Sequence, residues 1–168
     1  MPETQRIEDL RRRVQQDPTS IAFAQLAEEC RRAGEYQEAV DVCHAGLAVH
    51  PGYTSARVTL GRALLQLNRL DDAKAELRSV LAAAPDNLTA IRGLAQIYER
   101  QGALADALVH YQAALSRAPN DPEIEQTIAR LSRASAGVSS ERDKALRTVV
   151  ALEQWLHALH AARPDRRA

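Results

Sequence analysis

The sequence predicts an all-α protein, a short right-handed α-solenoid of stacked helical hairpins. Three prolines, Pro51, Pro85 and Pro119, stand 34 residues apart, and a fixed period of this length is typical of repeat architectures. The chain of 168 residues is 45% hydrophobic but only 4% aromatic, which favours closely packed helices over a β-sheet core. Because the residue before a proline disfavours the α conformation, each of the three prolines marks the end of a helix.

Apolar and small residues follow the same period. Four further series keep their side-chain type in register: Ala39, Ala73 and Ala107; Leu26, Leu60 and Leu94; Leu47, Leu81 and Leu115; and Tyr36, Leu70 and Leu104. Gly34 and Gly102 lie two periods apart with Asn68 midway, and these residue types suit tight turns between helices. The spacing predicts six helices, near residues 20–33, 37–50, 54–67, 71–84, 88–101 and 105–118.

The repeated unit resembles the tetratricopeptide repeat, whose pattern is W-x-x-L-G-x-x-Y, then A-x-x-x-F, then P. Three copies match it: Phe23, Leu26, Ala27, Cys30, Ala39, Cys43 and Pro51; Arg57, Leu60, Gly61, Leu64, Ala73, Leu77 and Pro85; and Ile91, Leu94, Ala95, Tyr98, Ala107, Tyr111 and Pro119. Arg57 departs from the large apolar type, which predicts looser packing where the second repeat begins. The resemblance implies antiparallel helix pairs with a continuous core between neighbours.

The chain divides into repeats and terminal elements. We expect an N-terminal capping helix over 1–18, three repeats over 19–121 (20–53, 54–87 and 88–121), a capping helix over 122–133, a small-residue linker over 134–140, an amphipathic helix over 141–162 and a disordered tail over 163–168. Within the first element, the run Arg11-Arg12-Arg13 is read as a solvated charged face.

The helix expected over 141–162 carries an apolar stripe. Its docking face is formed by Ala145, Val149, Leu152, Trp155, Leu156 and Leu159. A stripe of this size is too apolar to stay in water. Docking on the last repeat is the favoured interpretation, and docking on a second copy, as a homodimer, or on a partner stays open.

Composition and charge narrow the function classes. Lys plus Arg and Asp plus Glu both number 22, and a net charge of zero argues against nucleic acid as a partner. The first residues hold no apolar segment typical of a secretory leader, so we expect a cytoplasmic protein with no membrane insertion. Cys30 and Cys43 fall at core positions of one repeat. No motif indicates catalysis, so we expect no enzyme activity, no cofactor and no metal.

The resemblance implies a concave groove that takes an extended peptide or a helix, lined by the first helix of each repeat. By register its lining is Ala24, Glu28, Arg31, Val58, Thr59, Arg62, Leu65, Arg92, Gln96 and Glu99. Arg62 and Arg92 either hold a carboxylate bidentately or are solvated or ion-paired between repeats. The Lys and Asn residues with which some members clamp a chaperone's C-terminal carboxylate are absent from the matching positions. We expect a protein–protein interaction module, an adaptor or scaffold in a multiprotein assembly; the alternative is a dedicated chaperone for a secreted or assembling substrate.

Overall fold

The computed structural model describes the backbone of residues 3–161 and the side chains of residues 5–155. Helices account for most of the described backbone, which contains no strand. In chain order they are α1 (Glu3–Gln16), α2 (Ala22–Arg32), α3 (Tyr36–Val49), α4 (Thr54–Gln66), α5 (Leu70–Ala83), α6 (Leu88–Arg100), α7 (Leu104–Arg117) and α8 (Pro122–Ala161). Two compact units divide the chain, Met1–Ile128 and Ala129–Ala168. The all-α class predicted from the sequence is confirmed.

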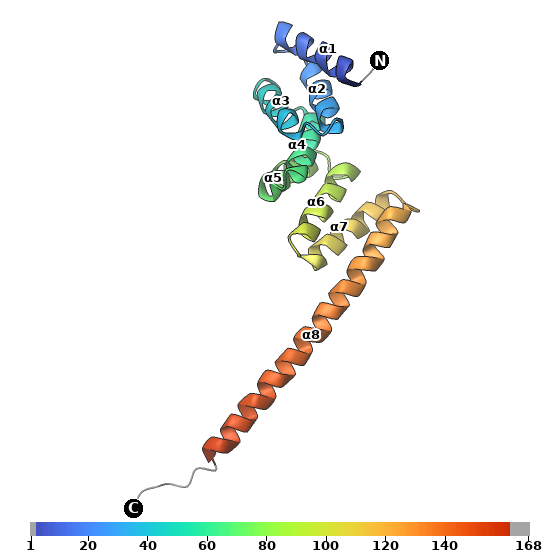
Figure 1. The fold of residues 1–168 in the computed structure, drawn as a ribbon. Helices are drawn as coiled ribbons and strands as arrows, with labels where there is room; N and C mark the ends of the chain where they lie inside the picture. Colours follow the sequence, from blue (N-terminus) through green and yellow to red (C-terminus); the bar gives the residue numbers. More distant parts are fainter. Residues whose placement is uncertain (1–2, 162–168) are drawn as a thin grey trace, which may run out of the picture. The chain divides into compact units, whose positions relative to one another are not determined.

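Three helical hairpins form most of the first unit (Figure 1). They are the pairs α2 with α3, α4 with α5 and α6 with α7; the two helices of each pair pack together, and each of the first two hairpins packs against the next one. Every helix predicted from the period begins and ends within two residues of an observed one. The period was informative because Ala39, Ala73 and Ala107, and likewise Leu26, Leu60 and Leu94, recur at matching positions and are all buried.

Three residues with positive φ make the turns inside the hairpins. Gly34, Asn68 and Gly102 have φ of 84°, 59° and 74°, which is the left-handed region where a side chain is normally unfavourable. Asn tolerates this region better than most residues. This explains why Asn68 occupies the place that glycine holds in the other two repeats.

Small residues let neighbouring helices approach closely around Leu77, which is fully buried on α5. A Cβ placed on Gly61 or on Gly93 would lie 2.6 Å from a methyl group of Leu77. The Leu77 side chain therefore fills the space left by a glycine of its own repeat and by a glycine of the following repeat.

Helix α1 packs on the first repeat through apolar and charged side chains. Ile7 and Leu10 are buried. Arg11 Nη2 donates to Glu38 Oε2 at 2.6 Å and to Glu35 Oε2 at 3.0 Å. The interpretation of the arginine run as a solvated face is thus wrong for Arg11, which ties α1 to α3 because acidic residues of the neighbouring turn lie within its reach.

Helix α8 corrects the expected linker. Residues 134–140 are helical and continuous with the segments before and after them. This segment, Ala-Ser-Ala-Gly-Val-Ser-Ser, contains no proline, and its single Gly137 costs a helix only about 1 kcal/mol. A small-residue composition was therefore mistaken for a break, and the capping helix over 122–133 and the helix over 141–162 belong to one element.

The apolar stripe of α8 consists of exposed side chains over its described part. Every described side chain from 136 to 155 is exposed, including Ala145, Val149, Leu152 and Trp155. Docking of this stripe on the last repeat stays a prediction. Leu156 and Leu159 lie in the helix, but their side chains are outside the described residues, as is the tail over 163–168.

Candidate binding groove

The first helices of the repeats, α2, α4 and α6, lie side by side and form one face of the first unit. The structure brings most of the predicted lining residues together on this face. Two hollows open along it. One lies between α2 and the start of α4 and measures about 290 Å³, with Ala24 and Glu28 in its wall.

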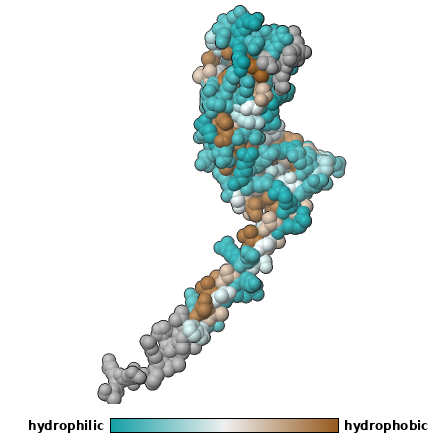
Figure 2. Space-filling view, in the orientation of Figure 1, coloured by the Kyte–Doolittle hydropathy of each residue, from teal (hydrophilic) through white to brown (hydrophobic). Residues whose placement is uncertain are grey.

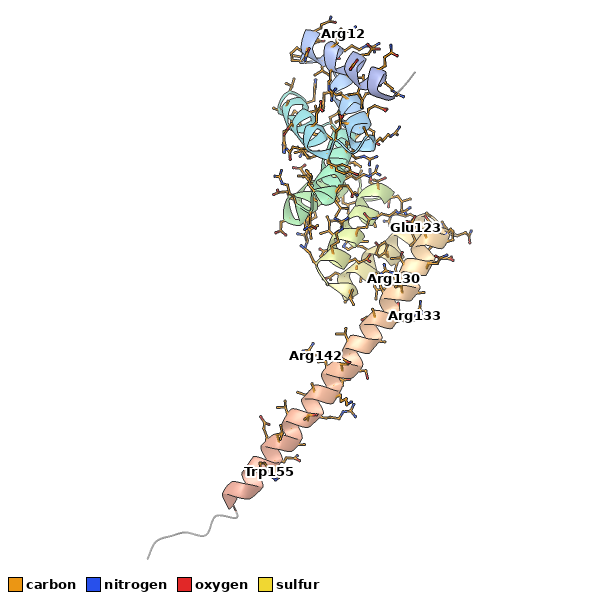
Figure 3. The ribbon with its side chains drawn as sticks, in the orientation of Figure 1. Arg12, Glu123, Arg130, Arg133, Arg142 and Trp155 are labelled. Carbon is orange, nitrogen blue, oxygen red and sulfur yellow. The ribbon has the colours of Figure 1, made fainter. Side chains whose placement is uncertain are left out.

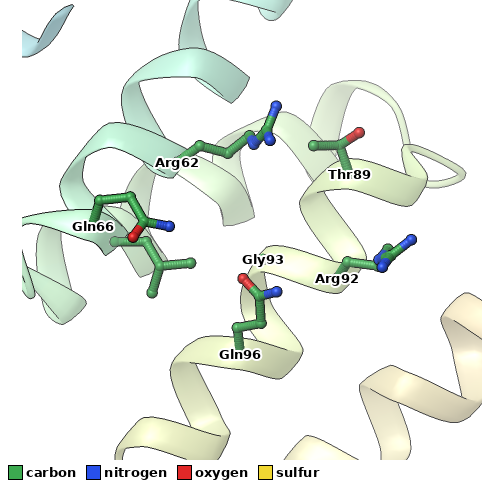
Figure 4. Close-up of a pocket in the computed structure, with 7 residues that line it drawn as sticks. Arg62, Gln66, Thr89, Arg92, Gly93 and Gln96 are labelled. Atoms are coloured by element: carbon green, nitrogen blue, oxygen red, sulfur yellow. The ribbon is translucent and has the colours of Figure 1, made fainter. Parts of the chain in front are cut away.

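The second hollow, which we call the central cleft, lies between α4 and α6 and measures about 360 Å³. Its wall consists of Arg62, Leu65, Gln66, Thr89, Arg92, Gly93 and Gln96 (Figure 4). Arginine, amide and hydroxyl groups dominate this wall. A ligand in the cleft would therefore meet mainly hydrogen-bond donors, with a cation on each side.

Glu28 is the centre of a charged network beside the cleft. Arg31 donates to both of its carboxylate oxygens, at 2.8 and 2.9 Å, and Arg32 and Thr59 donate to it at 3.1 and 3.2 Å. The hydrogen bonds from Arg31 lower the pKa of Glu28 to about 2, against the opposing effect of partial burial. The same pair raises the pKa of Arg31. Glu28 and Arg31 thus satisfy one another.

Arg62 is held more loosely than its neighbours. Its Nη1 atom lies 4.0 Å from Glu28 Oε1, which is too long for a hydrogen bond. Partial burial, followed by the positive charge of Arg31, lowers the pKa of Arg62. A lowered pKa means that the surroundings disfavour the charged form. An anion in the central cleft would therefore stabilise the charged form of Arg62.

Arg92 forms ion pairs within the protein. Its Nη1 atom donates to Asp121 Oδ2 at 3.1 Å and its Nη2 atom to Glu123 Oε2 at 2.9 Å. Asp121 precedes α8, so Arg92 connects α6 to the start of that helix. Of the roles that the sequence left open for Arg92, an ion pair between elements is present, and the binding of a partner's carboxylate stays a prediction.

The remaining predicted lining residues differ in exposure. Val58 is half-buried, Thr59 is nearly buried, and Leu65 is 2% exposed, so Leu65 forms the floor of the cleft and not a contact surface. Glu99 accepts a hydrogen bond from the Tyr111 hydroxyl at 2.9 Å, while Gln96 is exposed.

Gln66, Thr89 and Gly93 were absent from the predicted lining. A signal for them existed in the helical spacing. Gln66 lies one turn after Arg62, and Thr89 lies one turn before Arg92, so both share the face of an arginine that was predicted. Extending each predicted face by one turn would have found these residues.

The two cysteines are buried and free. Burial raises the pKa of each thiol to about 12, which leaves almost no thiolate at neutral pH. Cys30 also lies within 4.8 Å of carboxylate oxygens of Glu35 and Glu38, but Arg11 donates to both carboxylates. This cluster is therefore read as a structural ion pair around a core residue.

No helix in the described part of the chain is long and apolar enough to cross a bilayer.

The fold and its recessed, hydrogen-bonding face together define a class of protein, the α-solenoid built from short helical hairpins.

The particular family follows from comparison with known proteins. The family model described as "Tetratricopeptide repeat" matches residues 31–96 and 71–131, so the chain belongs to the tetratricopeptide repeat family. A curated relative, "Uncharacterized protein y4yS" of Sinorhizobium fredii (strain NBRC 101917 / NGR234), is 33% identical over 96 residues, which are 57% of this chain and 52% of the relative. The matched region thus spans about half the length of that relative.

Solved structures share the fold. MamA residues 41–end from Desulfovibrio magneticus RS-1 superpose with a TM-score of 0.74 at 21% identity, covering 90% of this chain and 86% of that one. The first repeat domain of Spaghetti (RPAP3), solved with the HSP90 peptide SRMEEVD, gives 0.66 at 18% identity, covering 71% and 94%. A thermophilic protein of this family from Thermus thermophilus gives 0.63 at 26% identity, covering 74% and 70%.

Proposed function

We propose that this protein is a non-catalytic protein–protein interaction module, an adaptor or scaffold that holds a peptide or helix of its partner against α2, α4 and α6. The family consists of interaction repeats, and one solved relative was obtained with a bound peptide. The partner segment would lie along the two hollows, and it would reach the central cleft with an acidic side chain.

The observation that carries this proposal is the state of Arg62. Its neighbours Arg31 and Arg92 each donate to carboxylates at 3.1 Å or less, whereas Arg62 has its nearest recorded carboxylate oxygen at 4.0 Å. Arg62 is partly desolvated and lies among other cations. A carboxylate arriving with the partner would give it a charge-assisted pair, and such pairs are stronger than neutral hydrogen bonds.

An array of random peptides, half of them containing Asp or Glu, tests the proposal. The full chain should retain acidic peptides in preference to neutral ones, and Arg62→Glu should lose that preference. Arg13→Glu is the matched control. Arg13 is exposed on α1, so this substitution makes the same change of charge outside the groove. Equal binding by both variants, or no preference for acidic peptides, would contradict the role of Arg62.

A further inference from the structure

Among the described residues, α8 carries a run of exposed apolar side chains that take no part in the groove. Val138, Val149, Leu152 and Trp155 are 62%, 50%, 55% and 61% exposed. Figure 2 shows apolar atoms along this part of the chain, and Figure 3 marks Arg142 and Trp155 on the helix. Because α8 continues through 134–140, Val138 joins the stripe that the sequence placed farther along the chain.

The stripe has the spacing of a coiled-coil seam with one charged residue inside it. Positions 138, 142, 145, 149, 152, 156 and 159 alternate steps of four and three residues, the pattern that keeps one helix facing another. They hold Val, Arg, Ala, Val, Leu, Leu and Leu. The run covers about three heptads, or about 33 Å of helix at 1.5 Å per residue. Arg142 is the exception that any occupant of this face must accommodate.

The charges of the helix argue against a lipid surface as the occupant. Residues 138–161 contain three basic side chains, Arg142, Lys144 and Arg147, and three acidic ones, Glu141, Asp143 and Glu153. Helices that lie on anionic membranes have a basic polar face and gain from electrostatic attraction. This segment is neutral with alternating signs, so a protein surface of matching sign pattern fits it better.

We propose that the occupant is α8 of a second copy of this chain, running antiparallel. In a parallel pair, the two Arg142 side chains would face one another across the seam, which places like charges together. In an antiparallel pair, the steps of four and three residues along one helix meet the same steps in reverse order along the other. The seam positions from 138 to 156 therefore still face one another. In that register Val138 faces Leu156, and Arg142 faces Leu152 of the second copy.

The antiparallel register also gives Arg142 a partner. A seam side chain packs among four residues of the facing helix, which for Arg142 are Val149, Leu152, Glu153 and Leu156 of the second copy. The guanidinium reaches Glu153 while its methylenes cover Leu152. The small Ala145 faces Val149 at the centre. By symmetry the dimer contains the Arg142–Glu153 pair twice, so the charge pattern is self-complementary only when the helices run in opposite directions.

Sedimentation equilibrium of the full chain over a range of concentrations tests this inference. Wild-type protein should form a dimer of twice the 18.5 kDa chain mass, with emission of Trp155 shifting to the blue as the dimer forms. Arg142→Glu and Glu153→Arg should each raise the dissociation constant at least about tenfold, a change of about 1.4 kcal/mol. The double variant should recover the dimer, and an equimolar mixture of the two single variants should form a heterodimer.

Matched controls separate this geometry from other outcomes. Arg147→Glu makes the same change of charge on the opposite face of α8 and should leave the dissociation constant unchanged. An unchanged melting curve of the repeats would show that each variant is folded. A monomer at all concentrations overturns the proposal, as does a dimer that tolerates Glu153→Arg, which a parallel pair would do. Binding of the monomer to phosphatidylserine vesicles would assign the stripe to lipid instead.

Discussion

Phe23 and Gly46 pack as a complementary pair between the two helices of the first repeat. Phe23 is 1% exposed at the start of α2, and a Cβ on Gly46 of α3 would collide with its ring. One and two periods later the same two positions hold other combinations, Arg57 with Val80 and Ile91 with Ala114. The residue on the second helix of each repeat thus differs with the residue that it faces on the first helix.

Gly46→Ala tests this complementarity. Alanine favours a helix over glycine by about 1 kcal/mol, but the added methyl group displaces the ring, and overpacking of a core costs about 1–3 kcal/mol. We expect net destabilisation in urea unfolding, and partial recovery when Phe23→Leu is added, because leucine gives the methyl group room. A stabilised Gly46→Ala protein would show that the ring moves aside freely.

Glu28 should make stability depend on pH. Its folded-state pKa is about 2, below the ordinary value of 4.5. A depressed pKa contributes stability above pH 4.5, and this contribution is lost as pH falls from about 4.5 through about 2. Glu28→Gln should cost about 1.5–3 kcal/mol near pH 7, as for hydrogen bonds to charged groups.

Urea unfolding of wild type and Glu28→Gln at several pH values measures this difference. The gap between the two proteins should shrink steadily below pH 4.5. A gap of constant size down to pH 2.5 would mean that the carboxylate is not the group that Arg31 and Thr59 stabilise.

The sequence predicted helices better than it predicted ion pairs. Helix positions follow from one period, whereas the partners of Arg57 and Arg92 do not recur with it. Arg57 was expected to loosen the second repeat, yet it donates to Glu76 at 2.9 Å and to the Pro51 carbonyl. One period before Arg92 and Asp121 stand Val58 and Asn87, which form no ion pair, so periodicity held no signal for these contacts.

Helix α8 shows what the composition of a segment alone misses. Ala, Ser and Gly are frequent in linkers, but Ala is also the best helix former. A break needs a proline or a cluster of glycines, and residues 134–140 contain only Gly137. Helix α8 is continuous through 134–140 because this segment contains no residues that end a helix. The composition of the segment does not reveal this.

Gly137→Ala should strengthen this middle of α8. No atom lies within 4 Å of a Cβ placed there, so only the helix propensity changes, by about 1 kcal/mol. Amide hydrogen exchange across 134–140 should slow about fivefold as a result. Gly52→Ala, a loop position with equally open surroundings, is the control and should leave these amides unchanged. Unprotected exchange in the wild type would contradict the continuous helix.

Burial differs between the repeats and the far part of α8. The first buries its apolar residues between hairpins, while the described side chains of 136–155 are all exposed. Ending the chain after Ala136 should therefore change the unfolding free energy of the repeats by less than about 0.5 kcal/mol, as for surface changes. Thermal unfolding followed by circular dichroism at low concentration measures this, and a larger loss would reveal support that the exposed helix gives to the repeats.

The packing of Leu77 limits how repeat units can be duplicated or rearranged in such a chain. Repeat proteins gain and lose whole units by duplication and deletion within the gene. Leu77 needs glycine at position 61 of its own unit and at position 93 of the next one. The residues that correspond to Gly93 in the first and second units are Gln25 and Thr59. A copy of either unit inserted after the second would place a side chain against Leu77, so the unit that follows the second must carry glycine at this position unless Leu77 also changes.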